Sequence, residues 1–263
     1  MSGRTEKSRM KSLQTFGKFA FAALAATSLL ASSAFAQTPM PREEIEKIIR
    51  EYILKNPEIV RDAIVELRKR DEQAEVKSRS EALAANKEKL FNSPRGVVIG
   101  NPKGNVTLVE FYDYNCGYCK RALNDVVQLT KNDPNLKVVL RQLPILSPGS
   151  VEAARVAVAV RLQDPAKYFA FHQILMSGRG EANGARALAA AQQAGLDVEK
   201  IKKDLSNPEI DATLQESAEL SEALKISGTP TYIIGDQIVP GALPYAQLSQ
   251  AIAMIRKCGK VEC

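Results

Sequence analysis

Between residues 41 and 70 the apolar positions recur with the period of a helix. One stripe comprises Ile45, Ile48, Ile49, Tyr52 and Ile53. Asn56-Pro57 then predicts the start of a second helix, because asparagine caps a helix N-terminus and proline suits its first position. The apolar face of this second helix comprises Ile59, Val60, Ala63, Ile64 and Leu67. Beyond Arg70 the stripe gives way to charged residues, which indicate a long solvated helix over 71–89.

Two short amphipathic helices cannot bury such a stripe by themselves. They either fold back on the rest of their own chain or pair with other copies of themselves. Both interpretations stay open at this point, and we favour self-association.

From residue 91 onward the pattern changes to short apolar strands and amphipathic helices. Strands are expected over 97–99, 106–112, 136–140, 231–234 and 237–239. Helices are expected over 121–131, 151–224 and 245–256, with breaks in the middle block at Pro165, Gly178–Gly180, Gly195 and Pro208. Gly235-Asp236, between the last two strands, is typical of a hairpin turn. This order predicts an α/β fold, namely a thioredoxin fold with a helical insertion, preceded by an N-terminal helical segment.

The first 36 residues have the composition of a targeting segment. A basic start is followed by an apolar run of 12 residues, Phe19–Leu30, and then by Ala34-Phe35-Ala36. This order is typical of a secretory signal peptide, and the run is shorter than the roughly 20 residues that a membrane-spanning helix needs. We therefore expect cleavage after Ala36 and export, with the bacterial periplasm as the natural compartment.

Charge does not favour a nucleic-acid partner. The full chain carries +6, but its first 36 residues hold five basic residues and one acidic residue, so the processed chain carries +2. A nearly balanced chain gives no electrostatic basis for binding nucleic acid. With 45% hydrophobic residues the chain is long enough to bury a core, and four cysteines are too few for a disulfide scaffold.

Two of the cysteines form the motif Cys116-Gly117-Tyr118-Cys119, between a predicted strand and a predicted helix. The partial positive charge and free N–H groups of a helix N-terminus stabilise a thiolate. Cys116 is then the expected nucleophile of thiol–disulfide exchange and Cys119 the more buried resolving thiol, with Tyr118 placed to tune their exposure. The alternatives are a structural disulfide and a zinc site shared with the C-terminal cysteines. The latter begin 139 residues after Cys119, far from the usual zinc spacing.

Two further positions favour the redox interpretation. Glu110 interrupts an apolar strand six residues before Cys116. It is either an outward-facing strand residue or a buried acid that accepts the proton of the resolving thiol. Gly228-Thr229-Pro230 precedes the predicted hairpin, and a cis bond at this proline would present a backbone edge to an extended substrate.

Three segments resemble the DsbA-like thiol–disulfide oxidoreductases. They are VTLVEFYDYNCGYC (106–119), RQLPILSPGSVEAARVAVA (141–159) and SGTPTYIIGDQIVPGALP (227–244). The resemblance covers most of residues 91–256 and implies the roles of four residues. Cys116 is the nucleophile, Cys119 the resolving thiol, Pro230 the cis-proline and Glu110 the buried acid.

The segment EYILKNPEIVRDAIVELRKR (51–70) is similar to the N-terminal helices of one branch of this family, the suppressor-of-copper-sensitivity C (ScsC) proteins. That resemblance implies a periplasmic homo-oligomer, with a trimer favoured. Gly117 and Tyr118 between the cysteines, and Thr229 before the proline, are similar to periplasmic disulfide isomerases. DsbA-type oxidases typically carry Pro-His and Val at these places. We therefore expect an isomerase or reductase, with a dithiol oxidase as the alternative.

The expected partners follow from this assignment. They are misfolded or cysteine-containing periplasmic proteins, together with a membrane redox partner that is either a DsbD- or ScsB-like reductase or a DsbB-like oxidase. The expected organisation is a signal peptide over 1–36, an oligomerisation segment and linker over 37–90, and the catalytic domain over 91–263, with its insertion at about 147–225. A copper-binding protein and a non-catalytic chaperone are alternatives of another class.

The other cysteines, the histidine and the basic residues after the motif give weaker indications of function. Cys258 and Cys263, with four residues between them, suit a structural disulfide, although free thiols or a metal-binding tail remain open. His172 is the only histidine and has no second ligand nearby in the sequence, so we interpret it as a packing or surface residue. Lys120 and Arg121 either favour the thiolate or are solvated surface charges. We expect no cofactor and no resident metal.

Overall fold

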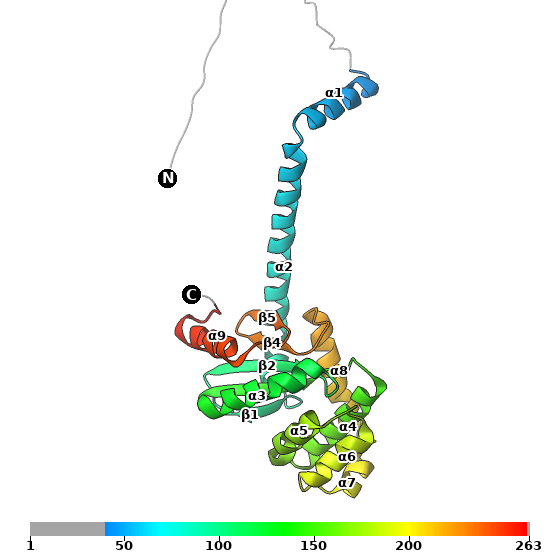
Figure 1. Ribbon diagram of the computed structural model, residues 1–263, viewed down its shortest axis with the longest axis vertical. Coiled ribbons are helices and arrows are strands. Elements are labelled where there is room, and N and C mark those ends of the chain that lie inside the picture. The colour runs from blue at the N-terminus through cyan, green and yellow to red at the C-terminus, as the bar shows by residue number, and fades with distance from the viewer. Residues whose placement is uncertain (1–39, 262–263) are drawn as a thin grey trace, which may run out of the picture. The chain divides into compact units, whose positions relative to one another are not determined.

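The computed structural model describes residues 40–261 (Figure 1). The expected signal peptide and Cys263 lie outside the described residues. Contacts divide the chain into two units, with the boundary between Arg61 and Asp62. Within the described residues, no helix combines the length and the apolar character that crossing a membrane requires.

The N-terminal region is helical, as its periodicity predicts. α1 (Arg42–Lys55) contains no buried residue. α2 (Glu58–Asn92) is a continuous helix whose buried residues are Leu83 and Leu90. The apolar stripes of both helices are exposed at Ile45, Ile48, Ile49, Tyr52, Ile53, Ile59, Val60, Ile64 and Leu67. The charged stretch over 71–89 is helical as expected, but it is not solvated throughout, because Leu83 packs into the core of the following domain.

The rest of the chain is built on a five-stranded mixed sheet. Its strands are β1 (Val97–Gly100), β2 (Val106–Tyr112), β3 (Leu136–Gln142), β4 (Thr231–Ile234) and β5 (Gln237–Pro240), in the spatial order β1-β3-β2-β4-β5. β2 and β3 are parallel, and the other three pairs are antiparallel. Nearly continuous apolar sequence in β2 and β3 suits central strands that are covered on both faces.

Alternation along the central strands gives the sheet two apolar faces. Leu108 and Tyr112 belong to one cluster, which α3 (Gly117–Asn132) and α9 (Tyr245–Cys258) cover. Val109 and Phe111 belong to the other, which Leu83 and Leu90 of α2 and part of α8 (Pro208–Ala223) cover. Glu110 lies between Leu108 and Tyr112 in this alternation, so its side chain faces the α3 side of the sheet.

The predicted helical insertion lies between β3 and β4 (Figure 1). It consists of α4 (Pro148–Gln163), the short 3₁₀ turn η1 (Pro165–Lys167), α5 (Tyr168–Ser177), α6 (Gly184–Gln193), α7 (Val198–Asp204) and α8. Small residues on α4 and α6 let these two helices pack closely, since Ala153, Ala157, Ala187 and Ala191 are all buried. The fold is therefore the expected thioredoxin-like α/β fold with a helical insertion.

Candidate active site

Cys116 is the N-cap residue of α3, at the point where β2 ends and the active-site helix begins. Its Sγ accepts the backbone N–H of Cys119 at 3.4 Å and donates to the carbonyl oxygen of Thr229 at 3.0 Å. Free N–H groups and the helix dipole at this end favour negative charge on the sulfur. Both cysteines are free thiols. The predicted pair therefore places one thiol at a helix N-terminus beside a second, more buried thiol.

The two cysteines differ in their surroundings. Cys119 is 1% exposed and Cys116 is 5% exposed. Burial raises the pKa of the Cys119 thiol far above its ordinary value, the backbone N–H of Asp113 partly offsets this, and the nearby Glu110 charge adds to the rise. A thiol of this kind needs a proton acceptor before it can attack, which agrees with the expected resolving role.

The dipeptide between the cysteines faces outward. Tyr118 is 61% exposed, and the guanidinium of Arg121 stacks over its ring at 4.3 Å. A Cβ at Gly117 would meet nothing closer than an Arg121 nitrogen at 3.8 Å. Neither position is held by core packing.

The Thr229–Pro230 peptide bond is cis, as the sequence suggested. Pro230 is buried at the start of β4, and the Thr229 carbonyl points at Cys116. Within the described residues the buried Thr229 hydroxyl has no hydrogen-bond partner. The loop therefore sets a backbone carbonyl directly beside the expected nucleophile.

Glu110 is a buried acid and not an outward-facing strand residue. It is 5% exposed and pairs in register with Tyr232 of β4, which is fully buried. Burial raises the pKa of Glu110 to about 8, partly offset by the neighbouring Tyr232 hydroxyl. That hydroxyl has no direct hydrogen-bond partner in the described part of the chain, so desolvation dominates. A carboxyl that titrates near neutral pH beside Cys119 suits a proton acceptor.

Sequence reasoning missed two residues that hold the active-site turn. The buried Asp113 carboxylate accepts the backbone N–H groups of Asn115, Ile145 and Leu146 at 2.8–3.1 Å. Asn115 exchanges hydrogen bonds with the backbone of Ala182 at 2.6 and 2.8 Å. The only available signal was an Asp and an Asn directly before the motif, where such residues commonly form turns.

His172 is a packing residue, one of the two roles expected for it. It lies on α5 among buried tyrosines, with Nδ1 3.3 Å from the Tyr114 hydroxyl. Burial lowers the pKa of His172 to about 3, so the ring is neutral at ordinary pH. The Tyr168 hydroxyl lies 2.6 Å from that of Tyr112 and accepts a hydrogen bond from Gln142. This network joins the insertion to the end of β2.

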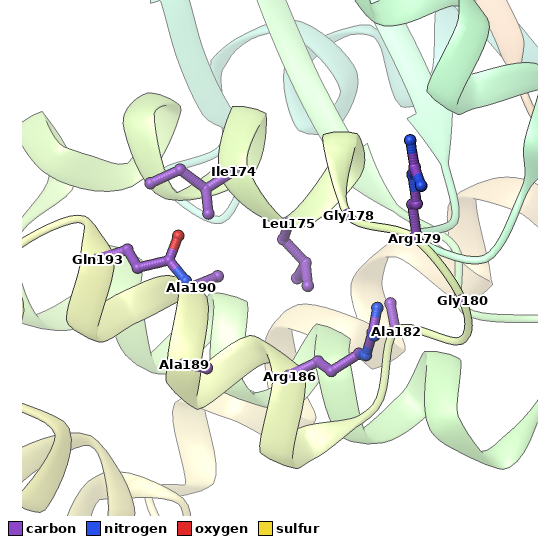
Figure 2. A pocket seen from close by; sticks show the side chains of 10 residues that line it. All are labelled: Ile174, Leu175, Gly178, Arg179, Gly180, Ala182, Arg186, Ala189, Ala190 and Gln193. Atoms are coloured by element: carbon purple, nitrogen blue, oxygen red, sulfur yellow. The ribbon is translucent and has the colours of Figure 1, made fainter.

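Lys120 ties the first turn of α3 to the insertion. Its Nζ donates to the carbonyl oxygens of Gly178 and Gly180 at 3.2 and 3.3 Å. The same loop borders a cavity of about 360 Å³ between α5 and α6, whose lining includes Arg179 and Arg186 (Figure 2). Lys120 therefore holds the loop between α5 and α6 against α3 and is not merely a solvated surface charge.

Cys258 is not part of this site. Cys258 is disulfide-bonded, and Cys263 lies outside the described residues. Within residues 40–261 no group of three or more metal-ligating side chains is assembled. The structure thus brings together Cys116, Cys119, Glu110, Gly117, Tyr118, Thr229 and Pro230, and leaves Cys258 elsewhere.

Two family models match the chain in adjacent regions. Residues 107–253 match the DSBA-like thioredoxin domain, and residues 42–74 match the copper resistance protein ScsC N-terminal domain. The first match contains the whole site described above. The second contains both exposed apolar stripes.

Solved structures agree with these matches. A thioredoxin-like oxidoreductase from Silicibacter pomeroyi is 44% identical, with 66% of this chain and 99% of that chain covered and a TM-score of 0.63. The catalytic domain of Proteus mirabilis ScsC is 32% identical, with 68% and 97% covered and a TM-score of 0.61.

A curated relative is much longer than this chain. It is a Na⁺/H⁺ antiporter NhaA 1 from Salinispora arenicola, 28% identical over 60% of this chain. The match spans 24%, about a quarter, of the antiporter's length. Both solved structures above are instead covered almost completely. Together with the family model over residues 107–253, they place this chain in the DsbA-like thioredoxin family, with an N-terminal region of the ScsC type.

Proposed function

We propose that this chain is a periplasmic thiol–disulfide exchange enzyme that acts on protein disulfides through Cys116 and Cys119. The observation that carries the proposal is the position of Cys116. Its Sγ caps a helix N-terminus, and it lies 3.0 Å from the carbonyl of Thr229, beside the more buried Cys119. Thiolate stabilisation, a substrate-facing backbone and a second thiol are what thiol–disulfide exchange requires.

In the proposed reaction the Cys116 thiolate attacks one sulfur of a client disulfide. A bond forms between Cys116 and that sulfur, the client disulfide breaks, and the other client sulfur leaves as a thiolate. Glu110 then accepts the proton of Cys119, whose sulfur attacks Cys116 and releases the client as a dithiol. If the released client thiolate first attacks another client disulfide, a different client thiolate is set free. When that thiolate attacks the client sulfur joined to Cys116, a new client disulfide forms, the mixed disulfide breaks, and Cys116 leaves as a thiolate, so the client is isomerised.

We favour isomerase or reductase activity over oxidation. Gly117 and Tyr118 between the cysteines, and Thr229 before the cis-proline, resemble periplasmic isomerases and differ from DsbA-type oxidases. The exposed stripes of α1 and α2 support a homo-oligomer, with a trimer favoured, in which several active sites act on one misfolded client. Keeping Cys116 and Cys119 reduced then requires a membrane reductase of the DsbD or ScsB type, whereas a dithiol oxidase would require a DsbB-like partner that reoxidises them.

The proposed organisation follows the sequence interpretation. Residues 1–36 are a cleaved signal peptide, 37–90 the oligomerisation segment and linker, and 91–263 the catalytic domain. The ScsC-type match over residues 42–74 supports the middle assignment. A solved relative from Salmonella enterica, described as a periplasmic thioredoxin-like protein and 31% identical to this chain, supports the compartment.

Refolding of scrambled ribonuclease tests the proposal. The reduced protein should restore ribonuclease activity, and Cys116→Ser should abolish that activity because no nucleophile remains. The double variant Cys258→Ser and Cys263→Ser is the matched control, since it removes the two other cysteines of the chain and leaves no unpaired thiol from the disulfide of Cys258. Failure to reactivate scrambled ribonuclease, together with rapid oxidation of reduced ribonuclease, would assign the oxidase function instead.

Copper binding is a second candidate. The ScsC family model is described as a copper resistance protein, and two free thiols, Cys116 and Cys119, lie together in this chain. Thiolates are suitable ligands for Cu(I). Titration with Cu(I) should give one bound ion per chain that Cys116→Ser removes, and no difference between the two proteins would exclude this role for the pair.

A further inference from the structure

A groove of about 320 Å³ runs along the cis-proline loop. Its lining comprises residues 224–231, the end of β5 and Arg79. Arg79 belongs to α2, so the helix that precedes the catalytic domain forms one wall of a groove in that domain. Arg79 is not among the site residues described above, and the exchange chemistry does not require it.

The groove and the reactive sulfur share one residue, Thr229. Thr229 lines the groove, and its carbonyl oxygen lies 3.0 Å from the Sγ of Cys116. An extended client segment that is disulfide-linked to Cys116 and continues past Thr229 would enter the groove with the residues that flank its cysteine.

The charged side chains that line the groove, those of Arg79 and Lys225, are both cations. The Arg79 Nη2 donates to Glu75 Oε1 at 2.5 Å, one turn earlier on α2. A guanidinium has five N–H donors, and the side chain is 47% exposed, so donors remain for a ligand. Lys120 and Arg121 add positive charge next to the motif itself.

We propose that Arg79 is a specificity-determining residue, through which α2 selects extended client segments that carry an acidic side chain close to their reactive cysteine. A client carboxylate would accept hydrogen bonds from Arg79 while its cysteine is held at Cys116. The inference rests on the exchange function proposed above. It adds a client class, acidic segments, and a role for α2 that is separate from self-association.

Three synthetic peptides test the proposal on the full-length reduced protein. Each carries one cysteine as a mixed disulfide with a coloured aryl thiol, and they differ only in a Glu, Gln or Lys two residues from that cysteine. Attack by Cys116 joins the peptide to the enzyme and releases one aryl thiolate, whose absorbance gives the rate constant. Exposed charge pairs predict that the Glu peptide reacts about fivefold faster than the Lys peptide.

Variants identify the residue responsible. Arg79→Gln should reduce the Glu-to-Lys rate ratio to about twofold, and Arg79→Glu should invert it, whereas Glu75→Gln should raise it because Arg79 loses its competing partner. Arg70→Gln is the matched control, since Arg70 pairs with Glu66 on the same helix but does not line the groove. It should leave the ratio unchanged.

Three results would count against the proposal in different ways. An unchanged ratio in Arg79→Glu would overturn the role of Arg79. A ratio that Lys225→Gln abolishes and Arg79→Gln preserves would overturn it too, by assigning the preference to Lys225. No reaction with any of the three peptides would instead overturn the exchange function on which the inference rests.

Discussion

The N-terminal helices and the catalytic domain both depart from the usual distribution of side chains, in opposite directions. α1 and the first half of α2 expose isoleucines and valines to water. The domain buries ionisable side chains, among them Glu110, Asp113, Arg141 and His172. Each departure costs free energy in the isolated chain.

Exposed apolar side chains and buried ionisable side chains are stabilised in different ways. Exposed apolar stripes are completed by another surface, so they indicate assembly. Buried ionisable groups are completed either by partners inside the fold, as for Arg141, or by a reaction that uses their altered proton affinity, as we propose for Glu110. Each idea can be tested by substitution of single residues.

The largest expected effect is loss of assembly. The double substitution Ile49→Asp and Ile64→Asp should convert the proposed oligomer to monomer, because each lost side chain removes about 2 kcal/mol of burial per copy and each new charge opposes contact. Light scattering measures the mass. Val76→Asp, at an exposed position of α2 beyond the ScsC-type match, is the control and should stay oligomeric. A stable oligomer in the double variant would show that the stripes have another use.

The next effect concerns Glu110. Its pKa of about 8 in the fold lies above the ordinary value of 4.5, so the unfolded chain binds fewer protons between these pH values and stability falls as pH rises. Glu110→Gln should therefore gain about 5 kcal/mol relative to the native protein between pH 4.5 and pH 8. Urea unfolding at several pH values measures this. The variant should also resolve mixed disulfides more slowly, and a pH-independent stability difference would contradict a buried acid.

A smaller effect is expected at the buried ion pair. The fully buried Arg141 donates to Glu216 at 2.6 Å, across 75 positions of sequence. Glu216→Gln should cost about 3 kcal/mol, because it leaves a buried cation without its charge partner. The double variant Arg141→Met and Glu216→Leu should recover most of that loss. If the double variant unfolds at a lower urea concentration than Glu216→Gln, the ion pair stabilises the fold beyond the mutual neutralisation of its two charges.

The smallest effect is expected at His172. Because burial lowers its pKa to about 3, only the unfolded chain takes up a proton between the ordinary value of 6.5 and 3, and stability falls as pH falls. His172→Phe should remove about 2 kcal/mol of this loss between pH 6.5 and pH 5. Equal pH dependence of unfolding in the variant and native proteins would show that the ring is not desolvated in solution.

The local sequence pattern predicted most of the helices and strands. Its errors lie at element ends whose position depends on contacts with residues far away in the sequence. β4 has the predicted bounds, Thr231–Ile234. α3 was expected from residue 121 but starts at Gly117, since the motif residues carry no helical periodicity. The strand expected over 136–140 continues to Gln142, with Arg141 buried against Glu216.

The candidate site shows the same division. Cys116, Cys119 and Pro230 stand in recognisable local motifs, so the sequence was sufficient to select them. Asp113 and Asn115 were missed because their partners, in the turn after β3 and in the insertion, lie about 30 and 67 positions away. The single sequence contains no signal for those contacts.

The open surroundings of Gly117 have a consequence for how such proteins diversify. Neither this position nor Tyr118 supports the core, while Asp113 and Asn115 hold the turn in front of them. We therefore expect that the two residues between the cysteines can be exchanged during evolution at little cost to folding stability, so that one scaffold can present thiols of different reduction potential.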